Sequence, residues 1–206
     1  YANNEIGTLQ PVEAIGQACR AEGVPVISDA VQALGRVPIH AETCGADVLV
    51  LSSHKVYGPK GVGALWIRRA RPALRIRPQI HGGGHERGLR GGTLPVPLIV
   101  GFGAACELAG SLMEEEMVRC AQLRDRLLKG LQAAVPKLVV NGDMERRLAN
   151  NLNLSLPGVQ AEELLAACPE VALSSGSACS TDKLAPSHVL KAIGLSKAQV
   201  FSSLRF

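Results

Sequence analysis

The chain has 206 residues and a formal net charge of +4, and its composition is 47% hydrophobic, 19% charged and 3% aromatic. This composition is ordinary for a globular protein and excludes an intrinsically disordered chain. Because aromatic residues are so few, recognition of nucleic acids by base stacking is not expected. No apolar run approaches the ~20 residues that span a bilayer, so we expect no membrane segment.

The cysteines are scattered along the chain and form no C-x-x-C pair, which argues against a zinc site or a thioredoxin-like motif. The polar start of the chain has no features of a secretory signal. A reducing compartment is therefore expected, and we predict a cytoplasmic protein. The start without Met and the abrupt end after Phe206 lead us to expect a portion of a longer protein.

The first half of the chain alternates helical and extended patterns. A helix is predicted from Pro11 to Ala21, because proline suits the first turn and Gly23 ends the pattern. The segment Gln32–His40 reads as helix-like or as a loop. The predicted strands are Val24–Ser28, Asp47–Ser52 and Gly63–Arg68. Short apolar strands that alternate with a helix predict an α/β domain with a largely parallel sheet.

The glycine-rich segment His81–Gly92 interrupts this pattern and predicts a long functional loop. We place a domain boundary after it, so that residues 1–94 form one domain and residues 95–206 form a smaller α+β domain. The second domain begins with a long helix over Leu98–Ala134, which an interruption at Gly110 would divide. The later elements are predicted as strands at Leu138–Val140, Leu152–Leu156 and Val171–Leu173 and helices at Glu162–Cys168 and Ser187–Ala192.

The sequence Ser52-Ser53-His54-Lys55 follows directly on a predicted apolar strand. A hydroxyl, an imidazole and an amine then lie at the carboxyl end of that strand, where open α/β sheets bind ligands. A lysine at such a position can form an imine with a carbonyl compound. The alternative is an ordinary surface lysine after a strand.

Asp29 follows the preceding predicted strand. Enzymes that use pyridoxal phosphate (PLP) place a carboxylate against the pyridinium nitrogen, because the protonated ring is the electron sink of the reaction. An aspartate at a strand end is also a common helix N-cap. The position of Asp29 and Lys55 at the ends of two successive strands favours a cofactor site.

The segment Ser174–Ser180 is a run of small residues that contains one thiol, Cys179. A thiolate in an accessible loop can act as a nucleophile when a nearby cation or cofactor stabilises it. The alternative is a linker in which the cysteine has no role.

Two further features leave alternatives open. His81 and His85 have the i, i+4 spacing of a helical metal pair, but the glycines between them disfavour a helix. An anion held by backbone N–H groups and Thr93 is favoured there. A basic cluster reads either as solvated surface or as a docking patch for an acidic partner. Its members are Arg68, Arg69, Arg71, Arg75 and Arg77.

A set of motifs over essentially the whole chain resembles the cysteine desulfurases of the NifS/IscS type, within the class V aminotransferase superfamily. In chain order the motifs are Asn3–Gly7 (NNEIG), Asp29–Gln32 (DAVQ), Ser53–Gly61 (SHKVYGPKG), His81–Arg87 (HGGGHER), Arg90–Thr93 (RGGT), Ser174–Cys179 (SSGSAC) and Ser203–Phe206 (SLRF). The resemblance implies fold type I of the PLP-dependent transferases. It also implies that the chain forms the second half of the large, mostly parallel-sheet domain and a truncated small domain.

The resemblance implies the following PLP-binding residues: Asn4, Asp29, Gln32, Ser52, His54, Lys55 and Thr93. Lys55 would hold PLP as the Schiff-base lysine and move the Cα proton, and Asp29 would pair with the pyridine nitrogen. Gln32 and Asn4 would bind near the phenolate oxygen. Ser52 and His54 would bind the phosphate of the cofactor.

Three residues would act on other partners. Thr93 would reach the phosphate of the other subunit's cofactor, which implies a homodimer. Arg205, with help from Asn4, would bind the substrate carboxylate, a task that suits a guanidinium. Cys179 would take the sulfur of the substrate.

The implied reaction converts L-cysteine to L-alanine and leaves a persulfide on Cys179. The acceptor of that sulfur would be an iron–sulfur scaffold protein, where Cys179 transiently joins the cluster, or a tRNA-thiolation relay, without direct contact to nucleic acid. One alternative is a selenocysteine lyase or aminotransferase relative, although an aminotransferase needs no sulfur-accepting thiol. The other is a non-catalytic, truncated fragment that serves only for interaction.

Overall fold

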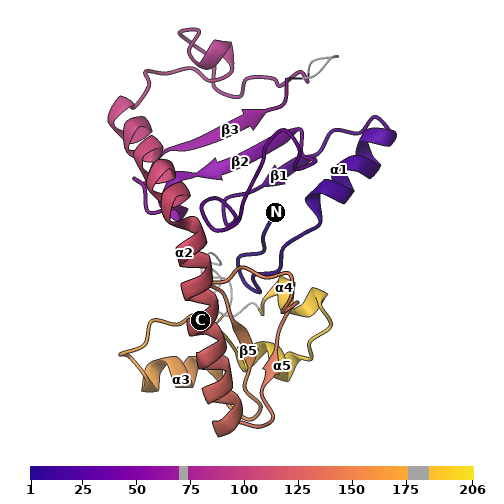
Figure 1. Cartoon of the computed structure of the whole chain (residues 1–206), viewed down its shortest axis with the longest axis vertical. Coiled ribbons are helices and arrows are strands. Elements are labelled where there is room, and N and C mark those ends of the chain that lie inside the picture. Colours follow the sequence, from indigo (N-terminus) through magenta and orange to yellow (C-terminus); the bar gives the residue numbers. More distant parts are fainter. Residues whose placement is uncertain (70–73, 176–185) are drawn as a thin grey trace. The chain divides into compact units, whose positions relative to one another are not determined.

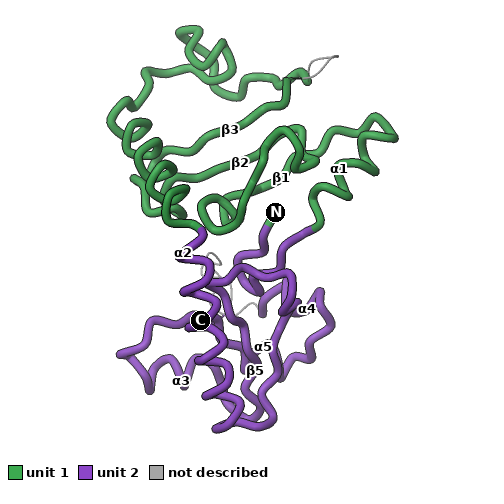
Figure 2. The backbone as a smooth tube through the Cα atoms, in the orientation of Figure 1, with its two compact units in different colours: residues 1, 11–113 green, residues 2–10, 114–206 purple. Residues whose placement is uncertain are grey.

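The structure is a computed structural model that describes residues 1–69, 74–175 and 186–206. The chain divides into two compact units, which Figure 2 colours separately. Unit 1 comprises Tyr1 and Pro11–Met113, and unit 2 comprises Ala2–Gln10 and Glu114–Phe206. The long helix α2 (Val96–Ala134) contributes residues to both units. The boundary between residues 94 and 95 that the sequence favours stays a prediction.

Unit 1 contains a three-stranded sheet in the order β1 (Ile27–Asp29), β2 (Val48–Ser52) and β3 (Gly63–Ile67), seen in Figure 1. β1 is parallel to β2, whereas β3 is antiparallel to β2. The described sheet is therefore mixed rather than largely parallel. The reason is the short connection between β2 and β3, since a parallel crossover usually needs a dozen or more residues and a helix.

The core of unit 1 lies between the sheet and helix α1 (Val12–Ala21), which matches the predicted helix. Its buried residues are Val12, Ala30, Cys44, Ala46 and Leu49. α1 approaches the loop before β2 so closely that a Cβ on Gly16 would lie 2.1 Å from the carbonyl oxygen of Gly45. The segment predicted as helix-like or loop, Gln32–His40, contains turns and no regular helix.

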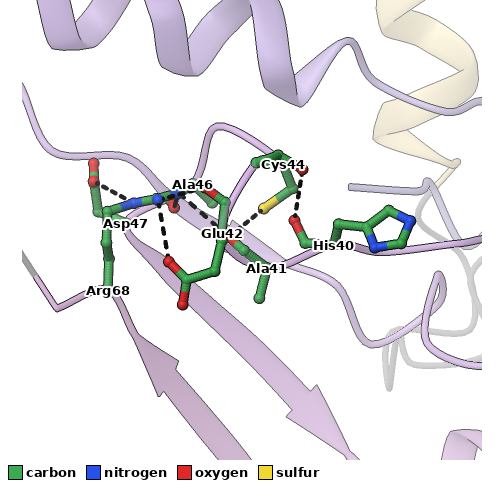
Figure 3. A network of polar contacts seen from close by, with 8 residues as sticks. His40, Ala41, Glu42, Cys44, Ala46, Asp47 and Arg68 are labelled. Carbon is green, nitrogen blue, oxygen red and sulfur yellow. Dashed lines mark hydrogen bonds and ion pairs between the residues drawn. The ribbon is translucent and has the colours of Figure 1, made fainter.

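Arg68 follows β3 and clamps the loop that leads into β2 (Figure 3). Its guanidinium donates to the carbonyls of Glu42 and Ala46, at 2.6 and 2.7 Å, and lies 3.3 Å from a carboxylate oxygen of Asp47. Its side chain is only 13% exposed and also packs over the ring of Trp66. Arg68 is therefore a structural residue, and neither reading of the basic cluster applies to it.

The rest of that basic cluster differs from Arg68. Arg69, Arg75 and Arg77 are exposed. Arg71 lies outside the described residues.

Unit 2 contains an antiparallel sheet of β4 (Val139–Val140), β5 (Asn153–Ser155) and β6 (Ser203–Arg205). Its short helices are α3 (Ala161–Ala167), α4 (His188–Ala192) and α5 (Lys197–Phe201). The strand predicted at Val171–Leu173 is wrong, because only Ser174 pairs there, in an isolated bridge with Arg205. α5 was not predicted, although its capping box of Ser196 and Gln199 is a sequence signal for a helix start.

The centre of unit 2 is polar as well as apolar. The amide of Asn141 donates to side-chain oxygens of Asn153, Ser155 and Ser203 at 2.8–3.1 Å. Buried polar groups are costly unless they are hydrogen-bonded, so this mutual pairing lets β5 be buried along its whole length. Apolar clusters flank it, one around Leu190 and one around Leu204.

Helix α2 runs without a break through Gly110, and Phe102 is its one buried residue. It contains an 18-residue window of mean hydropathy 1.7, of which 6% is buried. By length and composition α2 could therefore cross a membrane, contrary to our expectation that no apolar run approaches this length. A core helix can have the same length and hydropathy, so these two properties are only weak support for a membrane segment.

Candidate active site

The candidate site in unit 1 begins at the ends of two neighbouring parallel strands. Asp29 is the last residue of β1 and pairs with Val50 of β2. β2 ends at Ser52, and the 3-10 helix η1 (Ser53–Lys55) follows at once. Because parallel strands end at the same edge of a sheet, Asp29 and the Lys55 turn lie at one edge, the usual place of ligands in α/β sheets.

Ser52 and His54 form a polar pair at this edge. The Ser52 hydroxyl oxygen lies 2.7 Å from His54 Nδ1, and either group can be the donor, depending on the imidazole tautomer. Ser52 is half-buried and His54 is exposed. The arrangement offers a hydroxyl and a ring nitrogen side by side to an anion with several oxygens.

The turn that carries Lys55 has a constrained backbone. Lys55 is half-buried, and its carbonyl accepts a hydrogen bond of 2.9 Å from the Arg36 guanidinium. Tyr57 adopts a left-handed backbone with φ 63° and is 96% exposed. A Cβ on Gly58 would lie 2.2 Å from the Ser53 hydroxyl oxygen, so any larger residue here would displace this buried side chain. These contacts restrain the main chain from which the Lys55 side chain extends.

Asp29 and Gln32 are held by local contacts. Asp29 Oδ1 accepts a hydrogen bond of 2.8 Å from the Val31 N–H, and the residue is exposed. Gln32 Oε1 accepts a hydrogen bond of 3.1 Å from the Arg36 guanidinium, which also donates to the Lys55 carbonyl. Sequence reasoning missed Arg36; its i, i+4 spacing from Gln32 was the available signal.

Thr93 lies after the glycine-rich loop, which is irregular as predicted apart from the 3-10 turn η2 (Glu86–Gly88). The loop closes on itself through a hydrogen bond of 2.7 Å from the Gly91 N–H to the Ile80 carbonyl. Thr93 is exposed, and within the described chain it makes no hydrogen bond to the other predicted cofactor residues.

The spacing of His81 and His85 left a metal site open as an alternative reading. Within residues 1–69, 74–175 and 186–206, no group of three or more potential metal ligands occurs.

In unit 2 the structure joins the two predicted substrate residues. Arg205 Nη1 donates a hydrogen bond of 2.9 Å to the main-chain carbonyl of Asn4. Both residues are half-buried. Cys179 lies outside the described residues, so its position stays a prediction.

The described cysteines are Cys19, Cys44, Cys106, Cys120 and Cys168. All five are free thiols, and Cys44 is buried. Burial raises the pKa of the Cys106 thiol, which disfavours its nucleophilic form.

The side chains at the β1–β2 edge, those of Asp29, Ser52, His54 and Lys55, fit PLP chemically. It contains a carboxylate suited to a pyridinium, a hydroxyl and an imidazole suited to a phosphate, and an amine suited to an aldehyde. The Ser53 hydroxyl beside them is buried and has no hydrogen-bond partner in the described structure.

The whole chain, residues 1–206, matches the family model described as Aminotransferase class-V. The chain belongs to this family. Cysteine desulfurase IscS of Methylobacillus flagellatus is 52% identical over 204 residues, which cover 99% of this chain and 50% of that protein. A probable mitochondrial cysteine desulfurase of Dictyostelium discoideum is 49% identical over 99% of this chain and 45% of its own length. The chain thus spans about half the length of the curated relatives it matches.

Solved structures agree with this assignment to the class V family. A NifS-like protein superposes with a TM-score of 0.88 at 35% identity, over 100% of this chain and 53% of that one. DndA from Streptomyces lividans gives 0.80 at 37% identity, over 99% and 57%. The predicted resemblance to the NifS/IscS type and the predicted fold type I of PLP-dependent enzymes are confirmed.

Proposed function

We propose that this class V chain is part of a PLP-dependent cysteine desulfurase, which converts L-cysteine to L-alanine and transfers the sulfur to Cys179. The observation that carries the proposal is the position of Asp29 and the Lys55 turn at one edge of two parallel strands. The similarity to curated cysteine desulfurases over the whole chain supports it.

In this proposal the β1–β2 edge holds the cofactor. PLP supplies an electron sink for the substrate Cα when it is bound. Asp29 keeps the ring nitrogen protonated, and the Ser52–His54 pair binds the phosphate. Gln32 and Asn4 bind near the phenolate oxygen. Lys55 holds the cofactor covalently and moves the Cα proton.

The remaining roles concern the substrate and the sulfur. Arg205 and Asn4 bind the carboxylate of L-cysteine. The Cys179 thiolate attacks the substrate sulfur, so that a sulfur–sulfur bond forms and the carbon–sulfur bond breaks. The substrate carbon takes a proton and leaves as L-alanine, and the Cys179 thiol becomes a persulfide, which balances the reaction.

The wider assembly follows from the same proposal. Thr93 reaches the cofactor phosphate of a second copy in a homodimer. The cofactor domain spans residues 1–94 and the small domain residues 95–206. In a cytoplasmic setting, the persulfide passes to an iron–sulfur scaffold protein, with Cys179 as a transient cluster ligand, or to a tRNA-thiolation relay.

Product analysis tests the proposal against its alternatives. The protein, expressed with its whole natural sequence and loaded with PLP, is incubated with L-cysteine and a thiol reductant. We expect equal amounts of sulfide and alanine, and neither product after Cys179→Ala or Lys55→Ala. Turnover retained in Cys179→Ala would indicate a lyase or aminotransferase relative, and a wild type without turnover would indicate a non-catalytic protein.

A further inference from the structure

Glu5 carries a carboxylate that is buried in unit 2. The residue is 1% exposed, and its Oε2 accepts a hydrogen bond of 2.5 Å from the Ser187 hydroxyl. Among the described residues, no Lys, Arg or His forms an ion pair with Glu5. A buried carboxylate is costly unless it is hydrogen-bonded. The contact with Ser187 therefore compensates a group that packing alone would disfavour.

The main chain of Glu5 is held as firmly as its side chain. Its carbonyl accepts the side-chain amides of Asn151 and Asn153 at 3.3 and 3.1 Å. Its N–H donates to Asn3 Oδ1 at 2.9 Å, which also accepts from the Ile6 N–H at 3.0 Å. The turn from Asn3 to Ile6 is thus fixed on both sides of Asn4.

This turn and Arg205 belong to one closed ring of contacts, formed by Asn4, Glu5, Asn153 and Arg205. Asn153, which donates to the Glu5 carbonyl, pairs directly with Arg205 across β5 and β6. Arg205 in turn donates to the carbonyl of Asn4, the neighbour of Glu5. The direction of the guanidinium therefore depends on where the Glu5 turn is held.

Ser187 connects this ring to helix α4. Its hydroxyl oxygen accepts the Leu190 N–H at 3.1 Å as the N-cap and donates its proton to Glu5. A hydroxyl can do both at once, because it has one proton and two lone pairs. Alanine can do neither.

We propose that Glu5 and Ser187 are positioning residues that orient Arg205 toward the carboxylate of the amino-acid substrate. The proposal rests on the proposed function, in which Arg205 binds that carboxylate. Loss of the Ser187 hydroxyl leaves the Glu5 carboxylate buried without this partner, and the Asn3–Ile6 turn must shift to let water reach it. The carboxylate-dependent part of ligand affinity then falls.

Two ligands isolate that part of the affinity. L-alanine and ethylamine differ only by the carboxylate, and both bind a PLP enzyme through their amine. The dissociation constant of ethylamine divided by that of L-alanine measures what the carboxylate contributes to affinity. Both constants come from absorbance titrations of the PLP-loaded protein with its whole natural sequence. We expect Ser187→Ala to reduce this ratio about tenfold. Ser187→Thr, which keeps the hydroxyl, should retain it.

Ser196→Ala is the matched control. Ser196 is also an N-cap in unit 2, where its hydroxyl accepts the Gln199 N–H at 3.3 Å, and it makes no hydrogen bond to Glu5. Losing this cap should leave the ratio unchanged. If Ser187→Ala does not fold, Ser187→Gly replaces it, because glycine is tolerated at an N-cap but lacks the hydroxyl; the same loss is expected.

The outcomes separate this proposal from the function on which it rests. An unchanged ratio in the hydroxyl-free Ser187 variants, or an equal fall in Ser196→Ala, overturns the positioning role. Arg205→Ala is the reference, since it should abolish the carboxylate preference. A ratio that survives Arg205→Ala contradicts the proposed substrate site itself.

Discussion

The guanidinium of Arg205 donates to the main-chain carbonyl of Asn4 at 2.9 Å, and so joins strand β6 to a segment near the start of the sequence. A carbonyl orients a guanidinium without neutralising it. No carboxylate forms an ion pair with Arg205 in the described chain. Its positive charge therefore stays available for a carboxylate ligand, which suits a residue that binds an amino acid.

Replacing Arg205 by alanine should weaken the binding of L-cysteine. A charge-assisted hydrogen bond contributes about 1.5–3 kcal/mol, so KM should rise roughly 10- to 100-fold. Steady-state kinetics of sulfide release measure the change. Arg146→Ala, an exposed arginine in the same unit, is the control and should leave KM unaltered. An unchanged KM in the Arg205 variant would remove this residue from the substrate site.

Replacing Asp29 by asparagine should reduce alanine formation with little effect on stability. The amide oxygen can still accept the Val31 N–H, so the turn is kept, but the charge that would stabilise a protonated cofactor ring is lost. We expect a fall in kcat of about 100-fold, in line with the removal of one electrostatic group from an active site. Asp125→Asn, at an exposed carboxylate of α2, should retain full activity. Equal rates in the two variants would refute the role of Asp29.

Replacing Arg68 by alanine should destabilise unit 1. The change removes hydrogen bonds to main-chain carbonyls and leaves Asp47 without its ion-pair partner. We expect a loss of about 2 kcal/mol in the free energy of unfolding, measured with urea. Arg69→Ala, at the exposed neighbour, should change stability by less than ~0.5 kcal/mol. Similar losses of stability in both variants would argue against the role of Arg68 in holding the loop before β2.

The carboxylate of Asp143 should contribute to stability in a pH-dependent way. The main-chain N–H groups of Arg146 and Glu145, followed by the Arg146 guanidinium, hold its pKa below the usual 3.8. Because the pKa of the folded state is lowered, the contribution is present above the usual value. It is lost as pH falls through the pKa of the folded state.

Urea unfolding of the wild type and of Asp143→Asn, measured from neutral to acidic pH, tests the sign of this pH dependence. The difference in unfolding free energy should be constant above about pH 5 and should shrink toward zero as the carboxylate protonates. A difference that grows with acid would mean that the carboxylate is not stabilised in the folded state.

Local signals in the sequence located the residues at the sheet edge. Apolar runs before Asp29 and Ser52 marked the two strands, and the polar residues that follow had to lie at their carboxyl ends. The position of Lys55 after a buried strand needed no knowledge of distant contacts. For this reason the β1–β2 edge was predictable from short-range patterns.

Long-range pairing was not predictable in the same way. The antiparallel direction of β3 follows from its short connection to β2, and apolar periodicity, on which the prediction of a largely parallel sheet was based, does not contain this information. The role of Glu5 depends on Ser187 and Asn153, both far away in the sequence. A polar residue inside an NNEIG motif gave no sign that its carboxylate would be buried.

The central claim is that the sulfur of L-cysteine is transferred to Cys179, and mass spectrometry of the PLP-loaded protein tests it most directly. The protein is incubated with L-cysteine without reductant, and each cysteine-containing peptide is examined for added sulfur. We predict one extra sulfur on the Cys179 peptide, formed together with an equal amount of alanine, and none in Lys55→Ala. An unmodified Cys179 peptide alongside released alanine, or added sulfur on Cys19, Cys44, Cys106, Cys120 or Cys168 instead, would contradict the account.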